Sequence, residues 1–165
     1  MTPLPTRVLV EKLTDELNRR GWMLATAESC TGGLIAAAVT DRAGSSSVFD
    51  RGFVAYSYES KENLLNVSCE ILETHGAVSR ECATAMVQGT LAHSRADLAI
   101  SVTGIAGPGG GMPGKPVGLV YIGWGVRGGP VAVAEHNFPG DRTAVREQTV
   151  QAALAHLLDA LKVQP

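Results

Sequence analysis

An apolar run that breaks into a Ser/Thr/Gly turn near the start of the chain constrains the fold most strongly. Residues 22–27 suit a buried strand, residues 34–39 suit a helix, and Glu28-Ser29-Cys30-Thr31-Gly32-Gly33 lies between them. Such a turn leaves backbone N–H groups free in front of the helix, which favours an anion or an oxyanion. Ser29 would lie at the carboxyl end of a strand, where open α/β sheets bind ligands. The competing interpretation is that Ser29 is only a helix N-cap.

Apolar periodicity predicts helices alternating with strands, followed by a late hairpin. The continuous apolar run 98–103 predicts a central strand that is covered on both faces. The predicted helices are 6–20, 31–40, a helix from 57 through 65, 70–74, 81–92 and 141–161, and the predicted strands are 22–27, 49–56, 98–103, 117–126 and 131–138. This order predicts a three-layer α/β/α fold with a mixed, mostly parallel sheet of about five strands.

Composition limits the classes of protein that are possible. A chain of 165 residues with 45% hydrophobic residues is expected to form one domain over residues 1–165. The net charge of −2 provides no excess of positive charge that would attract nucleic acid or an anionic membrane. Three cysteines without CxxC spacing suggest reduced thiols, and no apolar run approaches the roughly 18 residues of a membrane span. We therefore expect a soluble, cytoplasmic protein.

Three other chemistries compete for the glycine-rich loops. Residues 109–115 match the spacing G-x-x-x-x-G-K, but Pro116 follows and a strand comes next, so this is a chance match and not a nucleotide-binding loop. The four histidines lack the spacing of a metal site, and no metal or other cofactor is expected. Cys30 could be a nucleophile at a helix N-terminus, but no histidine base lies in these loops, which favours a buried thiol.

Ser29 with Lys61 is the remaining candidate pair. A serine hydroxyl needs a base within hydrogen-bond distance, and a lysine can act as that base if burial keeps it partly neutral. Lys61 follows the predicted strand 49–56, which could run beside the first strand, and Tyr56 could pass a proton or orient the lysine. Spacing alone leaves the alternative open that Lys61 is a solvated surface charge.

Blocks of sequence along the whole chain allow a family to be identified. They are Ala27-Glu28-Ser29-Cys30-Thr31-Gly32-Gly33, Ala43-Gly44-Ser45-Ser46, Arg51-Gly52-Phe53-Val54 with Tyr56-Ser57 and Lys61, His75-Gly76-Ala77-Val78-Ser79, Thr103-Gly104-Ile105-Ala106-Gly107-Pro108, Lys115-Pro116-Val117-Gly118 and Gly140-Asp141-Arg142. In this order they resemble the C-terminal domain of the competence- and damage-inducible CinA family, with its nicotinamide-nucleotide amidase group. The resemblance covers residues 5 to 162.

The resemblance implies hydrolysis of the carboxamide of nicotinamide mononucleotide to nicotinic acid mononucleotide and ammonia. It implies a serine–lysine pair at Ser29 and Lys61 with Tyr56 close by, and a homo-oligomer. Family members also occur fused behind a molybdopterin-binding-like domain, which this sequence does not contain, so the pyrophosphatase activity linked to that domain is not expected. The expected substrate-binding residues are Thr31, Gly32, Gly33, Thr103, Gly104, Gly107 and Arg142.

The expected roles of these residues differ. Backbone N–H groups of the Thr31-Gly32-Gly33 turn or the Thr103-Gly104 turn would hold the oxyanion. The glycines at 104, 107, 109 and 110 would let the backbone approach the ribose phosphate. Arg142 would pair with the phosphate, unless it is a surface residue that pairs within the last helix. A non-catalytic interaction domain that serves competence or recombination partners is the alternative function.

Overall fold

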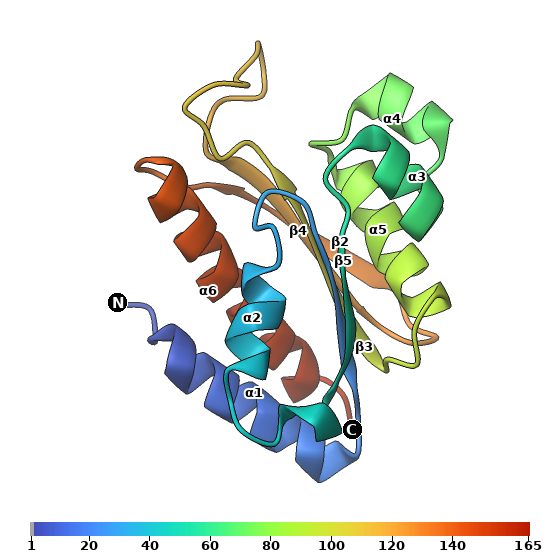
Figure 1. Ribbon diagram of the computed structural model, residues 1–165, viewed down its shortest axis with the longest axis vertical. Coiled ribbons are helices and arrows are strands. Elements are labelled where there is room, and N and C mark those ends of the chain that lie inside the picture. The colour runs from blue at the N-terminus through green and yellow to red at the C-terminus, as the bar shows by residue number, and fades with distance from the viewer. Residues whose placement is uncertain (1) are drawn as a thin grey trace.

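A mixed five-stranded sheet forms the centre of the protein, whose computed structural model describes residues 2–165 (Figure 1). The strand order is β2-β1-β3-β4-β5. Strands β2, β1 and β3 pair in parallel, whereas β4 is antiparallel to both of its neighbours. This confirms the predicted mixed sheet and its terminal hairpin. The strands are β1 (Leu24–Glu28), β2 (Phe49–Val54), β3 (Leu98–Gly104), β4 (Leu119–Val126) and β5 (Val131–Asn137).

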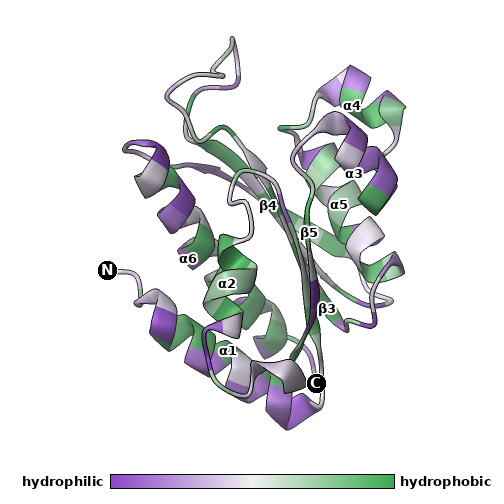
Figure 2. Cartoon of the chain, viewed as in Figure 1, coloured by the Kyte–Doolittle hydropathy of each residue, from purple (hydrophilic) through white to green (hydrophobic). Residues whose placement is uncertain are grey.

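Helices cover both faces of the sheet and complete the predicted three layers. One layer holds α1 (Thr6–Arg20), α2 (Leu34–Thr40) and α6 (Arg142–Lys162), and the other holds α3 (Tyr58–Leu65), α4 (Cys69–His75) and α5 (Arg80–Ala92). A short 3₁₀ turn, Ser45–Ser47, precedes β2. The strands are mostly hydrophobic, and polar segments lie on the outer sides of the helices and in loops (Figure 2). Within residues 2–165, none of the helices has both the length and the apolar character of a membrane span.

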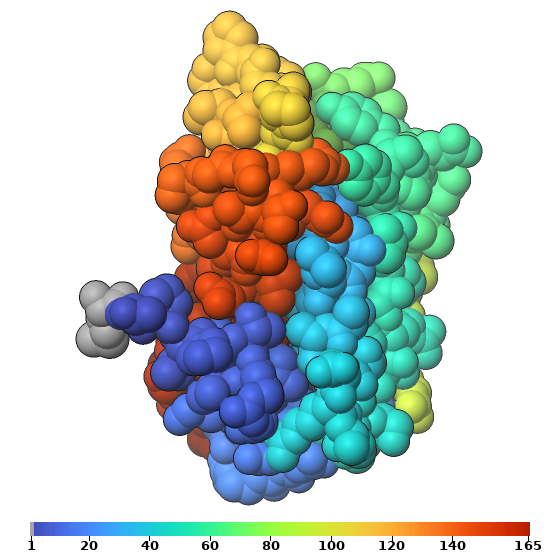
Figure 3. All heavy atoms as spheres, turned by 60° about the vertical axis from the view of Figure 1, so that its left-hand side comes forward, coloured from blue at the N-terminus to red at the C-terminus, as the bar shows by residue number. Residues whose placement is uncertain are grey.

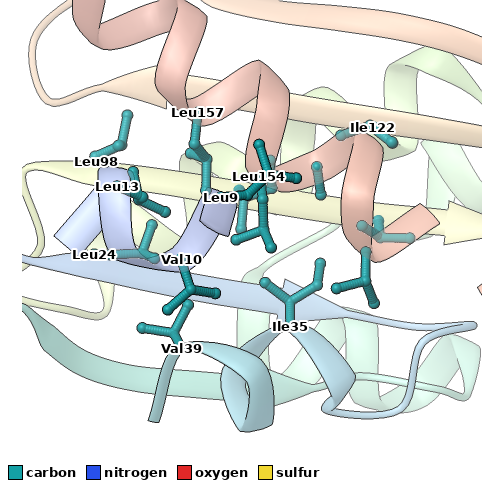
Figure 4. Close-up of a cluster of buried hydrophobic side chains, with 14 of the residues drawn as sticks. Leu9, Val10, Leu13, Leu24, Ile35, Val39, Leu98, Ile122, Leu154 and Leu157 are labelled. Carbon is teal, nitrogen blue, oxygen red and sulfur yellow. The ribbon is translucent and has the colours of Figure 1, made fainter. Parts of the chain in front are cut away.

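The larger apolar core lies between the sheet and the layer of α1, α2 and α6. Leucine, isoleucine and valine side chains from these three helices meet those of β1, β3 and β4 (Figure 4). Leu13 of α1 and Leu154 of α6 are both fully buried there. The first helix of the chain therefore packs against the last one and against the sheet. A smaller core, which includes Leu65 and Met86, lies under α3 and α5.

Side-chain caps fix where most helices begin. The hydroxyls of Ser57, Ser68 and Ser79 accept hydrogen bonds from backbone N–H groups in the first turns of α3, α4 and α5, and the carboxylate of Asp141 does the same for α6. The second helix begins at Leu34, later than the predicted residue 31, because the turn that precedes it contains two glycines with positive φ.

Gly89 of α5 allows α3, the helix that carries Lys61, to pack closely. A Cβ atom at Gly89 would overlap the backbone carbonyl of Leu65, the last residue of α3. Gly89→Ala must therefore push α3 away, and we expect it to lower the free energy of unfolding by about 1–3 kcal/mol. Urea denaturation measures this loss. The control is Gln88→Ala at the exposed neighbouring position. Equal stability of the two variants would contradict this account of the α3–α5 contact.

Candidate active site

The carboxyl ends of the three parallel strands meet at one edge of the sheet, and the candidate site lies there. Ser29 follows β1, Ala55 and Tyr56 follow β2, and Thr103 lies at the end of β3. The pairing continues past the strand ends, because Ser29 N–H donates to the Val102 carbonyl at 3.0 Å and Ala55 N–H donates to the Glu28 carbonyl at 3.0 Å. The peptide group that precedes Ser29 is thus held between the ends of β2 and β3.

Lys61 lies directly against Ser29. Its Nζ atom is 3.0 Å from Ser29 Oγ and also 3.0 Å from the carbonyl oxygens of Ala55 and Tyr56. Ser57 caps the start of α3 just after these carbonyls. The helix therefore begins early enough for the side chain of Lys61, its fourth residue, to come back to them. Only 1% of Lys61 is exposed. It is therefore a buried amine and not the solvated surface charge considered above.

The surroundings of Lys61 favour its neutral form. Burial lowers the pKa of Lys61, because desolvation disfavours the ammonium ion. Its hydrogen-bond partners in the described chain are three uncharged oxygens, with no carboxylate among them. A neutral amine has two N–H groups and one lone pair. It can donate to both carbonyls while the Ser29 hydroxyl donates to the lone pair, which is the arrangement that a general base requires.

Ser29 is not the N-cap of α2. The N-cap position is Gly33, and the free N–H groups of the helix are taken up by the Glu28 carboxylate instead. Glu28 Oε1 accepts from Ile35 N–H at 2.8 Å and from Thr31 Oγ1 at 2.7 Å, and Glu28 Oε2 accepts from Ala36 N–H at 3.1 Å. The residue before Ser29 therefore joins the end of β1 to the start of α2 and fixes the turn between them.

A cavity of about 250 Å³ opens in front of this pair. Ser29, Lys61, Tyr56 and Arg142 line it together, and they come from four separate segments of the chain. The Tyr56 hydroxyl accepts a hydrogen bond from Arg142 Nη2 at 3.2 Å, whereas it is the Tyr56 carbonyl that contacts Lys61. The structure thus places the backbone of Tyr56, and not its phenol, next to the lysine.

Arg142 lies at the mouth of the cavity and does not pair within its own helix. Its Nη1 atom donates to the Gly107 carbonyl at 2.8 Å, in addition to the bond with Tyr56. Arg142 brings a permanent positive charge to the lining of the cavity, and no carboxylate lines it among the described residues. The cavity therefore favours an anionic ligand.

The predicted substrate-binding residues fall into two groups. Thr103, Gly104 and Gly107 line the cavity, and Thr103 Oγ1 donates to the Ala77 carbonyl at 2.8 Å. The three residues of the Thr31-Gly32-Gly33 turn do not line it; the Thr31 side chain bonds to Glu28, and Gly32 N–H donates to the Ser29 carbonyl at 3.1 Å. Cys30, which was not among the predicted substrate-binding residues, lines the cavity instead.

The thiol of Cys30 is a poor candidate for the nucleophile. Its pKa is raised to about 11 by burial, although the positive charge of Arg146 opposes this effect. A thiol with this pKa is protonated at neutral pH, and only the thiolate attacks efficiently. Ser29, with an amine against its hydroxyl, is therefore the better candidate.

Comparison with known proteins identifies the family to which this chain belongs. The sequence model of the CinA C-terminal domain matches residues 6–161. The chain belongs to this CinA family. It is 52% identical to the nicotinamide-nucleotide amidohydrolase PncC of Enterobacter agglomerans over 88% of this chain and 87% of that protein. The CinA fold recurs in a competence/damage inducible protein from Agrobacterium tumefaciens, with a TM-score of 0.92, 47% identity and coverage of 98% of this chain and 99% of the other.

Other CinA relatives are much longer than this chain. The CinA-like protein of Akkermansia muciniphila is 49% identical over 86% of this chain, but the match spans only 34% of that relative's length. The CinA domain therefore occurs both at about the length of this chain and as one part of larger proteins.

The other loops of this CinA chain have structural roles. Lys115, at the end of the G-x-x-x-x-G-K match, donates from Nζ to the His75 carbonyl at 2.6 Å, and the chain then enters β4 as expected. The loop that contains it projects beyond the strand ends (Figures 1 and 3). No three potential metal-ligating side chains lie together within residues 2–165.

Two of the histidines are closer than the sequence indicated. His136 and His156 are 20 residues apart in the sequence, but their Nε2 atoms are 2.9 Å apart. His156 also stacks on Trp124, and His136 stacks on Phe138. Burial lowers the pKa of both imidazoles, so the pair is a packed, uncharged contact between β5 and α6. The pair lies outside the cavity.

Sequence reasoning missed two side chains that fix the turn that carries Ser29. Glu28 was seen only as part of a motif, although a carboxylate placed just before a helix is a recognisable N-terminal partner. Arg146 of α6 donates from Nε to the Cys30 carbonyl at 3.1 Å and from Nη2 to the Thr31 carbonyl at 3.3 Å. No local signal could have revealed Arg146, because it lies 116 residues from Cys30 in the sequence.

Proposed function

We propose that this chain is a nicotinamide-nucleotide amidohydrolase that converts nicotinamide mononucleotide to nicotinic acid mononucleotide and ammonia through a serine acyl-enzyme. The observation that carries the proposal is the placement of Lys61 Nζ, buried, 3.0 Å from Ser29 Oγ and without a carboxylate partner in the described chain. The similarity to PncC supplies the substrate. Ser29 is the nucleophile and Lys61 the general base.

Acylation begins with transfer of the Ser29 hydroxyl proton to the lone pair of Lys61. As Oγ bonds to the carboxamide carbon, the carbonyl oxygen becomes an oxyanion. The new ammonium of Lys61 then protonates the amide nitrogen, the carbon–nitrogen bond breaks and ammonia leaves. Lys61 is neutral again, and a water that gives it a proton attacks the ester. Collapse of this second intermediate returns the proton to Ser29 and releases the acid.

The oxyanion needs backbone donors that the fold does not already use. Gly32 N–H is occupied by the Ser29 carbonyl, so the N–H of Cys30, which lines the cavity next to the nucleophile, is the better donor. One such donor is worth about 3 kcal/mol of transition-state stabilisation. The N–H groups at Thr103-Gly104 are the second candidates, because these residues also line the cavity.

The substrate's phosphate would bind at Arg142. The guanidinium lies at the cavity mouth, in contact with Tyr56 and Gly107, and its fork of N–H donors suits a phosphate. The absence of a lining carboxylate among the described residues removes a source of repulsion. Tyr56 would position Lys61 through its carbonyl and Arg142 through its hydroxyl. Association into a homo-oligomer and the lack of nucleic-acid partners stay predictions.

Ammonia release tests the proposal. Purified protein incubated with nicotinamide mononucleotide should release ammonia and nicotinic acid mononucleotide in equal amounts, as measured by a coupled ammonia assay and chromatography. Chelation with EDTA should leave the rate unchanged, because a serine–lysine pair needs no metal. The matched control is nicotinamide riboside, which lacks the phosphate and should react with a higher KM. Absence of ammonia would favour the non-catalytic interaction domain. A loss of activity on treatment with EDTA that added zinc restores would contradict the serine–lysine mechanism.

A further inference from the structure

The turn that presents Ser29 is held from two sides by charged side chains. Glu28 accepts hydrogen bonds from the side of α2, as described above, and Arg146 donates to the turn from α6. Figure 3 shows the first half of α6 packed against the segment that follows β1. The two peptide groups that Arg146 contacts are those that immediately follow Cys30 and Thr31.

Arg146 fixes the direction in which the N–H groups of this turn point. A peptide group is planar and trans, so its carbonyl and its N–H point in opposite directions. By bonding the Cys30 carbonyl at 3.1 Å, Arg146 sets the orientation of the Thr31 N–H, and by bonding the Thr31 carbonyl it sets that of the Gly32 N–H. The Gly32 N–H bonds the Ser29 carbonyl, which closes the turn around the nucleophile.

Arg146 is partly buried and bonds the backbone of the turn. Within the described chain its partners are these two carbonyl oxygens and no carboxylate. The charge of Arg146 reaches the thiol of Cys30, where it opposes the effect of burial on the pKa. Both the fork of donors and the charge therefore act on the segment beside Ser29.

We infer that Arg146 is a positioning residue for the nucleophile: it orients the turn from Ser29 to Gly32 so that Ser29 Oγ faces Lys61 and the Cys30 N–H faces the oxyanion. Arg146 itself does not line the cavity, so it acts on the turn and not on the substrate. This inference rests on the proposed serine–lysine mechanism. Its signature is a loss in kcat without a loss in substrate affinity.

Arg146→Met removes both donors and the charge but retains the apolar stem. We expect kcat for nicotinamide mononucleotide to fall about 10- to 100-fold while KM stays within about twofold, because small displacements of a nucleophile cost this much. Arg146→Lys keeps the charge but loses the planar fork whose Nε and Nη2 reach the two carbonyls, so its kcat should lie between those of the wild type and Arg146→Met. The pH dependence of the remaining activity should be unchanged, because Lys61 keeps its surroundings.

Arg127→Met is the matched control. Arg127 also bonds backbone carbonyls, those of Leu91, Ser94 and Ala96, but at the opposite end of the sheet. Arg127→Met should lower the urea midpoint by about as much as Arg146→Met does, and it should leave kcat unchanged. Full kcat in Arg146→Met, or a raised KM with unchanged kcat, would overturn the inference. If Arg146→Met does not fold, Arg146→Lys takes its place: a lowered kcat with unchanged KM supports the inference, and full kcat overturns it.

A second measurement separates this inference from the proposed function. Phenylmethanesulfonyl fluoride sulfonylates a reactive serine with loss of fluoride and a proton, and intact-protein mass follows the rate. If the wild type releases no ammonia but Ser29 is labelled more slowly in Arg146→Met than in Arg127→Met, the proposed substrate is wrong and the inference stands. Equal labelling rates overturn the inference. If the wild type neither releases ammonia nor is labelled, both fail.

Discussion

Ser29→Ala should reduce ammonia release from nicotinamide mononucleotide to background while the chain stays folded. The substitution removes the atom that forms the acyl bond, and loss of a nucleophilic serine costs a factor of about 10⁴ or more in kcat. The structural cost should be small. Only one hydrogen bond to Lys61 is lost, which is worth about 1 kcal/mol. Steady-state ammonia assays and urea denaturation measure the two effects separately.

Ser101→Ala is the matched control for Ser29→Ala. Ser101 is also buried and donates from its hydroxyl to the Ala83 carbonyl at 2.8 Å, but it does not line the cavity. Its loss should cost stability without changing kcat. A folded Ser29→Ala protein that retains more than a few per cent of wild-type turnover would show that Ser29 is not the nucleophile.

Lys61→Arg and Lys61→Ala should both be nearly inactive. A guanidinium cannot lose its proton near neutral pH, so arginine keeps the charge of lysine but cannot accept the Ser29 proton. Alanine removes both the charge and the proton acceptor. Steady-state kinetics should show the loss in kcat, with Lys115→Arg as the control, because Lys115 bonds a carbonyl outside the cavity. A Lys61→Arg enzyme with normal kcat and a raised KM would instead assign Lys61 to phosphate binding.

The pH profile of the wild-type enzyme is a second, independent test of Lys61. Because burial lowers the pKa of Lys61, its neutral form should be populated at a lower pH than that of a free lysine. The rate should fall as pH drops through this lowered pKa, since protonation removes the base, and it should level off above it. A rate that does not change with pH across this range would exclude Lys61 as the base.

Much of the fold could be predicted because its signals are local. The serines at 68 and 79 mark helix starts through their own hydroxyls, and the apolar run 98–103 indicated the central strand β3. The ends of elements were less accurate. The first strand begins at Leu24 and not at Trp22, because Trp22 N–H still bonds the Leu17 carbonyl at the end of α1.

The candidate site could be predicted only in part. Family motifs indicated Ser29 and Lys61, but their contact depends on the parallel pairing of β1 and β2 and on the return of α3. The carbonyls of Ala55 and Tyr56 that surround the amine carry no sequence signature, because every residue has a carbonyl. Arg146 was missed for a similar reason, since a contact between α6 and the turn follows from packing and not from spacing.

The pairing of α1 with α6 has a consequence for the order in which the protein can fold. Arg20 of α1 donates to the Leu161 carbonyl, 141 residues later in the chain. During synthesis, which proceeds from the N-terminus, Ser29 and Lys61 emerge long before α6 exists. Until α6 docks, the leucines of α1 and the part of this sheet face that α6 covers, on β3 and β4, stay open to water, which favours aggregation of the nascent chain. Docking of α6 is therefore needed both to cover this apolar face and to bring Arg146 to the turn around Ser29.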